Sequence, residues 1–260
     1  MAKSKITMES LRKWNFVLAG LHAVQGVAVV ILAKSVTFPI SVNFLTPNSL
    51  APEGSFSLVP ATQNVFDLNL AYLVAAFFFM SAFAHIAMAT FYRPTYEKNL
   101  KNHLNKARWY EYALSASTMM VAIAILSGVY DLASLLMIFA LTAFMNGTGL
   151  LMEVWNGKSK KVNWLSFILG SKAGIIPWIV IGIYFWSANV YGSGQIPSFV
   201  YWIYGSLFLF FNCFAINMYL QYKRKGKWAD YLYGERVYMI LSLVAKSVLA
   251  WQVFFGALRP

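Results

Sequence analysis

Long apolar runs, separated by short polar segments, recur along almost the whole chain. They predict seven membrane-spanning helices, at residues 14–33, 68–92, 107–130, 132–152, 162–190, 199–222 and 237–258. A helix of roughly 20 residues rises about 30 Å, which is the thickness of the hydrocarbon core of a bilayer. Only a tight turn at "GVYD" separates the third run from the fourth, so these two helices should be antiparallel neighbours. The pattern predicts an all-α membrane protein, a seven-helix bundle forming a single domain over residues 1–260.

The longest loop, residues 34–67, joins the first two predicted helices. Within it "FPISVNFL" and "SFSLVPAT" alternate weakly between apolar and polar residues, and "TPNSLAPEGS" between them supplies turn-forming residues. This pattern predicts a small antiparallel β-hairpin. Because a lone hairpin is marginally stable in water, we expect it to pack on the helix ends or on a neighbouring subunit.

Composition supports a membrane protein. Hydrophobic residues make up 59% of the chain and charged residues 12%, about half the charged fraction of a soluble domain. The net charge of +12 is then better explained by basic loops on one side of a bilayer than by nucleic-acid binding. A single cysteine, Cys213, excludes an internal disulfide and a cysteine metal site. The charged segment "MAKSKITMESLRK" leads into a full-length span without a cleavage site, so we expect the first helix to be retained.

The basic residues fall almost entirely on one side of the predicted bundle. Seventeen of the 21 lie in the N-terminal segment and in alternate loops: Lys3, Lys5, Arg12, Lys13, Arg93, Lys98, Lys101, Lys106, Arg108, Lys158, Lys160, Lys161, Lys223, Arg224, Lys225, Lys227 and Arg236. The other side carries only Lys34 and Arg259. The positive-inside rule therefore places the N-terminus in the cytoplasm and the C-terminus, together with the hairpin, outside the cell. This arrangement predicts a multi-pass protein of the cell membrane, surrounded by lipid.

One lysine lies in the middle of the last predicted span. Lys246 is the only charge in "YMILSLVAKSVLAWQVFF", and a lysine there costs about 2.5–3.5 kcal/mol on insertion scales. Eight of the nine acidic residues fall in loops or at predicted helix ends, and the ninth is Glu111 in "ARWYEYALSAST". Because buried charges are usually paired, Glu111 is the expected partner. The match in depth requires the third helix to start earlier, within "KNHLNKAR", and the lysine to lean toward the start of its own helix.

Three interpretations of Lys246 remain open from the residues alone: a structural ion pair, a snorkelling lysine, or a functional lysine. Snorkelling suits Lys172, in the cytoplasmic third of the fifth span, better than a mid-span position. A functional lysine would serve a transport site or anchor a cofactor. A desolvated lysine can lose its proton and attack an aldehyde, which forms a Schiff base. The protonated Schiff base is a buried cation, and Glu111 could be its anion.

Hydroxyl groups are spaced to surround this pair. Ser242 precedes Lys246 by four residues, and Ser115 and Thr118 follow Glu111 by four and seven, so each lies on the same helix face as its charged neighbour. The alternative is that these small residues only allow helices to pack closely.

Two histidines, His22 and His85, also lie within predicted spans, with Gln25 and Ser81 near them in sequence. They could be hydrogen-bonded between helices, or they could accept a proton near the lysine. Without a matching carboxylate or cysteine they make a weak metal site.

Large aromatic residues are frequent in the spans. Several could line a slot for a long conjugated ligand, with Met145 as a soft filler: Tyr112, Trp178, Phe208, Phe210, Phe211, Phe214 and Trp251. Aromatic side chains that face lipid are the alternative.

Several stretches together resemble one family. "LSLVAKSVLAWQ" resembles the retinal-lysine helix of the heliorhodopsins, and "RWYEYALSAS" resembles their counterion helix. "AGLHAVQ", "SAFAHIA", "GIIPWI", "LFLFFNCFA" and "QYKRKGKW" are similar to further stretches of that family, so the resemblance extends over all seven predicted helices. The cytoplasmic N-terminus agrees with it, since heliorhodopsins are inverted relative to other microbial rhodopsins.

The resemblance implies a role for each matching position. Lys246 would carry all-trans-retinal as a protonated Schiff base, with Glu111 as counterion and Ser242 hydrogen-bonded near both. Ser81, His22 and His85 would belong to a linked polar cavity. The chromophore pocket would include Tyr112, Met145, Trp178, Phe211 and Trp251. The family also implies a homodimer with the first outer loop near the partner. Lys172 and Thr142 depart from the expected pattern, which affects colour and local hydration.

Two functions remain for such a chain: a photoreceptor that signals, and a light-driven or light-gated ion transporter. Outward proton pumps commonly use carboxylates on both sides of the Schiff base, whereas here Glu111 is the only acidic residue assigned to the interior of a span. Ser242 stands where pumps commonly carry Asp. We therefore favour a slow-cycling sensor that is not an enzyme, and its basic cytoplasmic loops could meet acidic lipids or a soluble signalling partner.

Overall fold

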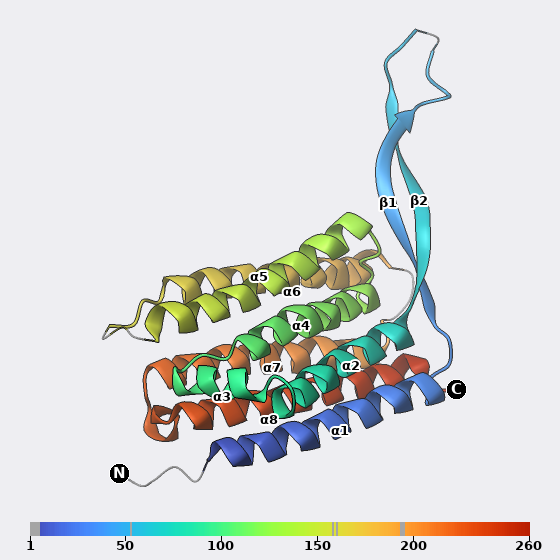
Figure 1. The fold of residues 1–260 in the computed structure, drawn as a ribbon. Helices are drawn as coiled ribbons and strands as arrows, with labels where there is room; N and C mark the ends of the chain where they lie inside the picture. Colours follow the sequence, from blue (N-terminus) through green and yellow to red (C-terminus); the bar gives the residue numbers. More distant parts are fainter. Residues whose placement is uncertain (1–5, 53, 158, 160, 193–195) are drawn as a thin grey trace.

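A computed structural model describes residues 6–52, 54–157, 159, 161–192 and 196–260. Within these residues, seven helices are long and apolar enough to cross a membrane. They are α1 (Met8–Leu32), α2 (Leu70–Ala89), α4 (Lys106–Leu126), α5 (Leu132–Asn156), α6 (Leu165–Tyr191), α7 (Ser198–Tyr222) and α8 (Tyr231–Val253), the last continued by the π-helical turn η2 (Phe254–Leu258). The start of α1 and the end of η2 lie at opposite ends of the bundle (Figure 1), as an odd number of crossings requires. The seven predicted spans are confirmed; which end faces the cytoplasm stays a prediction.

Side-chain caps explain where most of these helices begin. Thr7, Asn69, Asn105, Asp131 and Asp230 each accept a hydrogen bond from a backbone N–H in the first turn of the helix that follows. Such caps satisfy amide groups that have no partner within the helix.

Four of the lysines used in the topology argument lie outside the described residues: Lys3, Lys5, Lys158 and Lys160.

The connection before α4 differs from expectation. A separate short helix, α3 (Arg93–Lys101), precedes it, with Pro94 in its first turn. The chain then turns through His103, whose φ is 55°, and α4 begins only at Lys106, capped by Asn105. The third span therefore begins within "KNHLNKAR", as predicted, but at Lys106, only one residue before the expected bound of 107. The left-handed residue and the cap stop the helix even though the segment contains no proline or glycine.

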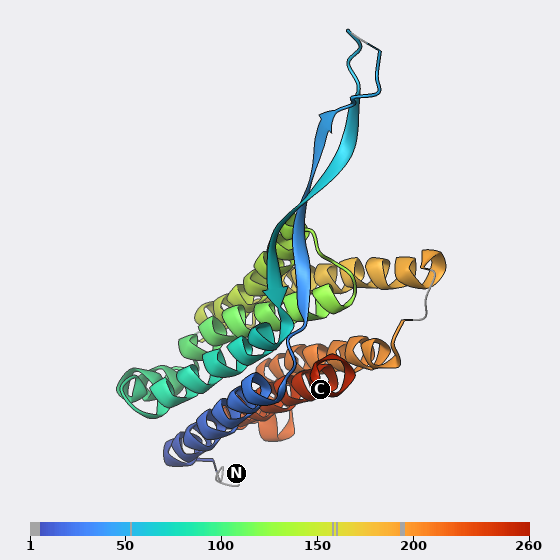
Figure 2. The same cartoon turned by 90° about the vertical axis from the view of Figure 1, so that its right-hand side faces the viewer.

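The first loop forms the predicted two-stranded antiparallel sheet, and it is longer than expected. Strands β1 (Thr37–Pro47) and β2 (Leu58–Asn69) pair from Thr37 opposite Asn69 to Pro47 opposite Leu58, with an irregularity between Ile40 and Ser41. The hairpin projects away from the bundle at the end where the chain terminates (Figures 1 and 2). Among the described residues, it meets the helix ends at its base, where Ser41 bridges to Asp131.

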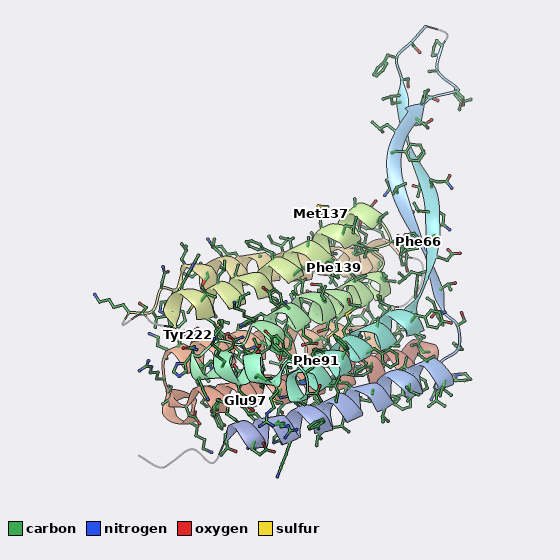
Figure 3. All side chains as sticks on the ribbon, viewed as in Figure 1. Phe66, Phe91, Glu97, Met137, Phe139 and Tyr222 are labelled. Carbon is green, nitrogen blue, oxygen red and sulfur yellow. The ribbon has the colours of Figure 1, made fainter. Side chains whose placement is uncertain are left out.

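The hydrophobic core of the bundle lies between helices that pack against one another. α2 and α4 lie between α1 and α5, and α8 packs against α1 and α7. Phe77, Phe78 and Ile123 are fully buried inside. Apolar side chains also cover the outer surface (Figure 3), and Phe91 and Met137 are among those most exposed. Apolar groups on both faces of the helices are what a bundle surrounded by lipid requires.

Candidate functional site

The lysine and the carboxylate predicted to pair do meet inside the bundle. Nζ of Lys246, on α8, lies 3.0 Å from Oε1 of Glu111, on α4. The two residues are 3% and 8% exposed. Nζ also donates a hydrogen bond of 2.7 Å to the hydroxyl of Ser242, one turn earlier on α8. The membrane therefore contains a buried ion pair between two helices that are far apart in sequence.

Two serines complete the surroundings of the carboxylate. Ser81 of α2 and Ser115 of α4 each donate a hydrogen bond of 2.6 Å to Oε1 of Glu111. Hydrogen bonds to a charged acceptor are stronger than those between neutral groups. Thr118 instead donates to the backbone carbonyl of Leu114, so the polar stripe expected along α4 ends at Ser115.

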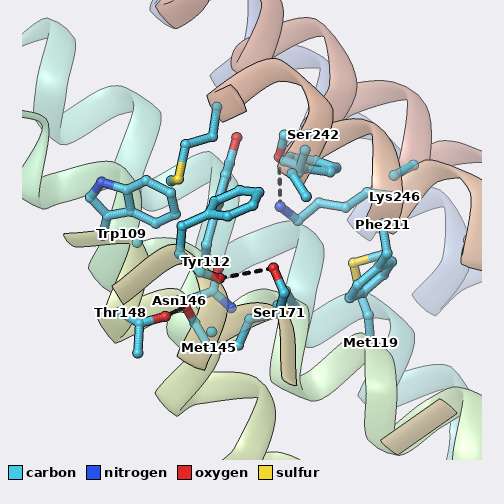
Figure 4. A pocket seen from close by; sticks show the side chains of 18 residues that line it. Trp109, Tyr112, Met119, Met145, Asn146, Thr148, Ser171, Phe211, Ser242 and Lys246 are labelled. Carbon is cyan, nitrogen blue, oxygen red and sulfur yellow. Dashed lines mark hydrogen bonds between the residues drawn. The ribbon is translucent and has the colours of Figure 1, made fainter. Parts of the chain in front are cut away.

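The amine of Lys246 opens into a mostly apolar cavity of about 120 Å³ (Figure 4). Of the predicted site residues, it is lined by Tyr112, Met145, Phe211, Ser242 and Lys246. Phe214, one of the aromatic residues expected to line a ligand slot, also lies in the lining. The remaining lining residues were not predicted for the site: Trp109, Ala116, Met119, Asn146, Thr148, Gly149, Phe167, Gly170, Ser171, Ala215, Met218 and Ala245. An amine at one end of an apolar cavity suits a long apolar ligand bearing a carbonyl group.

The two predicted tryptophans lie outside the lining of this cavity. The ring of Trp178 packs edge-on against Phe211, with 5.4 Å between centroids, and so supports the lining from behind. Trp251 donates through Nε1 to Oε1 of Gln25 at 3.0 Å, which places its ring edge between α8 and α1.

Close helix contacts shape the cavity on the α5 side. A β-carbon added at Gly149 would collide with the indole of Trp109, and one added at Gly174 would collide with the sulfur of Met145. Both glycines let a large side chain of a neighbouring helix lie against the backbone. Trp109 lies two residues before Glu111 in "RWYEYALSAS", so the sequence could have predicted that it lies near the site. The sequence could not have predicted its contact with α5.

The two intramembrane histidines stack on each other. Their ring centroids are 5.6 Å apart and their planes differ by 7°. Nδ1 of His85 lies 2.7 Å from Oδ1 of Asn15. Neither ring nitrogen of His22 has a hydrogen-bond partner among the described residues.

Of the two departures from the family pattern, Lys172 is exposed on α6. Thr142 is buried and donates to the carbonyl of Ile138.

A second buried charge cluster was missed from the sequence. Arg108 of α4 donates to Glu153 of α5 and to Glu235 of α8, and all three side chains are buried. The expectation that Glu111 is the only carboxylate inside a span is therefore wrong. α5 continues to Asn156 and α8 begins at Tyr231, so both glutamates lie within helices rather than in loops. The sequence feature that could have indicated this cluster is Arg108, which lies three residues before Glu111 and so on the same helix face.

A smaller cavity connects the two clusters. Its volume is about 10 Å³, and its lining includes Glu111, His85, Arg108 and Glu235. That is close to the minimum volume for one water molecule.

Comparison with known families identifies one match. The family model of heliorhodopsin matches residues 11–258, a range that contains all the site residues described above. A comparison with curated proteins finds no match.

Proposed function

Because the chain belongs to the heliorhodopsin family, we propose that Lys246 binds all-trans-retinal as a protonated Schiff base, with Glu111 as counterion. Membership itself makes the chain a retinal-binding, light-sensing membrane protein rather than a member of a classical enzyme family. The observation that supports the assignment is the buried amine of Lys246. It lies 3.0 Å from a carboxylate and opens into an apolar cavity between the helices.

The residues present fit this chromophore. Condensation of Nζ with the retinal aldehyde releases one water molecule and requires the unprotonated amine, which burial favours. Tyr112, Met145 and Phe211 would contact the apolar chain, and Trp178 would hold Phe211 in place. The positive charge that remains on Nζ needs a nearby anion in the membrane interior.

Bound retinal supplies one reaction, isomerisation on absorbing light. The protein groups then respond through the proton at Nζ. The free amine of Lys246 donates to both Glu111 and Ser242. In the dark, the single N–H of the Schiff base would donate to one of them, and Glu111 would neutralise its charge. Ser81 and Ser115 donate to the carboxylate. When that proton leaves Nζ, the attraction between α8 and α4 at this level is lost. A shift of α8 relative to α4 would carry the signal.

We favour a sensor over a transporter because of where the buried carboxylates lie. Glu153 and Glu235 join Glu111 in the interior, but all three belong to the half of the bundle in which α4 and α8 begin. Among the described residues, no buried carboxylate lies on the other side of Lys246. Outward proton pumps commonly use carboxylates on both sides of the Schiff base. The basic loops would face acidic lipid or a cytoplasmic signalling partner, and we expect the protein to be a homodimer.

Substitution of the lysine tests the assignment directly. Protein produced with all-trans-retinal should be coloured, and Lys246→Ala should lose the visible absorption band completely. Lys172→Ala is the matched control, because it removes another lysine from a membrane span, one that is exposed, and should keep a visible band. Unchanged visible absorbance in Lys246→Ala would show that this lysine is not the anchor.

A further inference from the structure

We propose that Glu153 and Glu235, which share the guanidinium of Arg108, accept the proton that leaves Nζ of Lys246 after light absorption. The inference rests on the proposed function and adds to it the internal destination of the proton. The Nζ–H bond breaks with its electron pair left on nitrogen, and an O–H bond forms on one of the two carboxylates. No proton crosses the membrane in this step.

Hydrogen-bond donors surround both carboxylates of the pair. Arg108 donates to Oε1 of both glutamates. Asn105 donates its backbone N–H to Oε2 of Glu153 at 2.8 Å and its side-chain amide to Oε2 of Glu235 at 2.7 Å. The hydroxyl of Tyr231 lies 3.3 Å from Oε1 of Glu153. Every oxygen of the pair therefore accepts a hydrogen bond.

The net charge of the cluster formed by Arg108, Glu153 and Glu235 indicates that it can take up one proton. Lys246 and Glu111 form a neutral pair, whereas Arg108 faces two carboxylates, so its cluster carries one negative charge. An uncompensated charge away from water is costly, and two carboxylates in one site readily bind one proton between them. Protonation would make the Arg108 cluster neutral. It would also loosen one of the two ion pairs of Arg108, whose guanidinium could then turn toward Glu111 on the next turn of α4.

The small cavity between the clusters provides a route. Its lining includes both Glu111 and Glu235, together with Asn15, His85 and Asn105. Arg108 and Glu111 are three residues apart, or about 4.5 Å along the helix axis. One water molecule in this cavity could pass a proton from the neighbourhood of Glu111 to the glutamate pair.

The histidine pair is the competing acceptor, and its surroundings favour it less. A protonated imidazole has two N–H donors that both need acceptors. His22 has none among the described residues, and for His85 the structure shows one, Oδ1 of Asn15. The small cavity is also lined by Tyr96, Tyr112 and Met239. None of these three residues is a carboxylate that could pair with a protonated histidine. A proton on a histidine would add a buried cation, whereas a proton on the glutamates removes a buried anion.

Infrared spectroscopy of the retinal-free protein tests the first half of the proposal. With isotope-labelled glutamate, acidification that stays well above the ordinary glutamate pKa of about 4.3 should produce one carbonyl band of a protonated carboxyl, shifted in heavy water. Glu153→Gln and Glu235→Gln should each remove this band, although each keeps one carboxylate, because the remaining glutamate and Arg108 form a neutral pair. Glu97→Gln, which removes a carboxylate from α3, is the control and should leave the band unchanged. The same band in both Gln variants would overturn the proposal.

Illumination of the retinal-bound protein tests the second half. As the unprotonated state of Nζ accumulates, the same carbonyl band should appear with the same time course and should be lost in both Gln variants. Glu235→Asp, which keeps the charge if the Gln variants fold poorly, should retain a band at a shifted frequency. Deprotonation without a carboxyl band, or with a band that moves only in Glu111→Asp, would overturn the acceptor assignment and leave the chromophore assignment intact. Failure to form any pigment would instead contradict the proposed function, and the retinal-free titration would still report on the glutamate pair.

Discussion

At the scale of single residues, the site is defined by charges that find partners inside an apolar bundle. Lys246 could be predicted because it stands alone in a long apolar run, and Glu111 because the other eight acidic residues fall in predicted loops or at helix ends. The cost of an unpaired charge in a membrane then leaves few alternatives. Arg108, Glu153 and Glu235 could not be placed in the same way. Each lies near the end of an apolar run, where a charged side chain usually reaches water, and only the packing of α4, α5 and α8 buries them.

Glu111→Gln tests the counterion role through colour. Excitation of a protonated retinal Schiff base moves positive charge away from the nitrogen, so an anion beside Nζ stabilises the ground state more than the excited state. Removal of the anion should narrow the gap and shift the absorption maximum to the red. Glu97→Gln, outside the spans, should leave the maximum in place. An unchanged maximum in Glu111→Gln, with Nζ still protonated, would remove Glu111 from this role.

At the scale of elements, the turn between α4 and α5 holds the base of the hairpin. Asp131 caps α5 by accepting hydrogen bonds of 2.8 Å from the backbone N–H and from the hydroxyl of Ser134. It also accepts a bond of 3.3 Å from Asn43 of β1. The backbone N–H of Ser41 donates to the carbonyl of Tyr130 nearby. The turn at "GVYD" was predictable from its residues, but its contact with the hairpin depends on how far β1 extends.

This cap should make stability depend on pH. The hydrogen bonds from Ser134 hold the pKa of Asp131 below its ordinary value. The stabilisation is therefore present above the unfolded value of about 4 and is lost as the pH falls through the lower folded value. Asp131→Ala should lower the free energy of unfolding by about 1 kcal/mol at neutral pH, and the difference from the unmodified protein should shrink in acid. Thermal unfolding in detergent measures both, and an equal difference at both pH values would contradict the cap as its source.

At the scale of the whole molecule, the hairpin is the part that a single chain leaves uncovered. Phe44 on β1 and Leu50 and Phe56 near the tip are exposed, and the strands extend beyond the bundle (Figure 2). Exposed apolar residues on a strand pair commonly mark a contact with another chain. The sequence predicted a hairpin, but one shorter than the structure has. Apolar and polar residues alternate poorly near the strand ends, so the pattern did not extend to them.

Shortening the hairpin should therefore affect assembly and not colour. Replacing residues 44–61 by a two-residue turn should convert the expected homodimer into a monomer, as judged by light scattering in mild detergent. The visible absorption band should remain, because Lys246 and its cavity lie within the helices. A dimer that persists after this change would place the interface on the bundle.

The arrangement of buried carboxylates also makes a prediction for the intact protein in a membrane. Because the described residues show no buried carboxylate on the C-terminal side of Lys246 along α8, illuminated vesicles or patched membranes should show no sustained ion flux. A photocurrent that grows with the amount of protein would favour a transporter.

The charges of α4 also bear on how the protein is made. α4 is the least hydropathic of the seven spans, with a mean hydropathy of 1.2, and it leaves the ribosome before the helices that carry its charged partners. Glu153 arrives with α5, but Glu235 and Lys246 arrive only with α8, the last span. Until then Arg108 and Glu111 lack part of their compensation, so α4 can settle at full depth only when synthesis is nearly finished. A nascent chain truncated before α8 should therefore integrate α4 poorly, and the quality control of the membrane would meet this intermediate first.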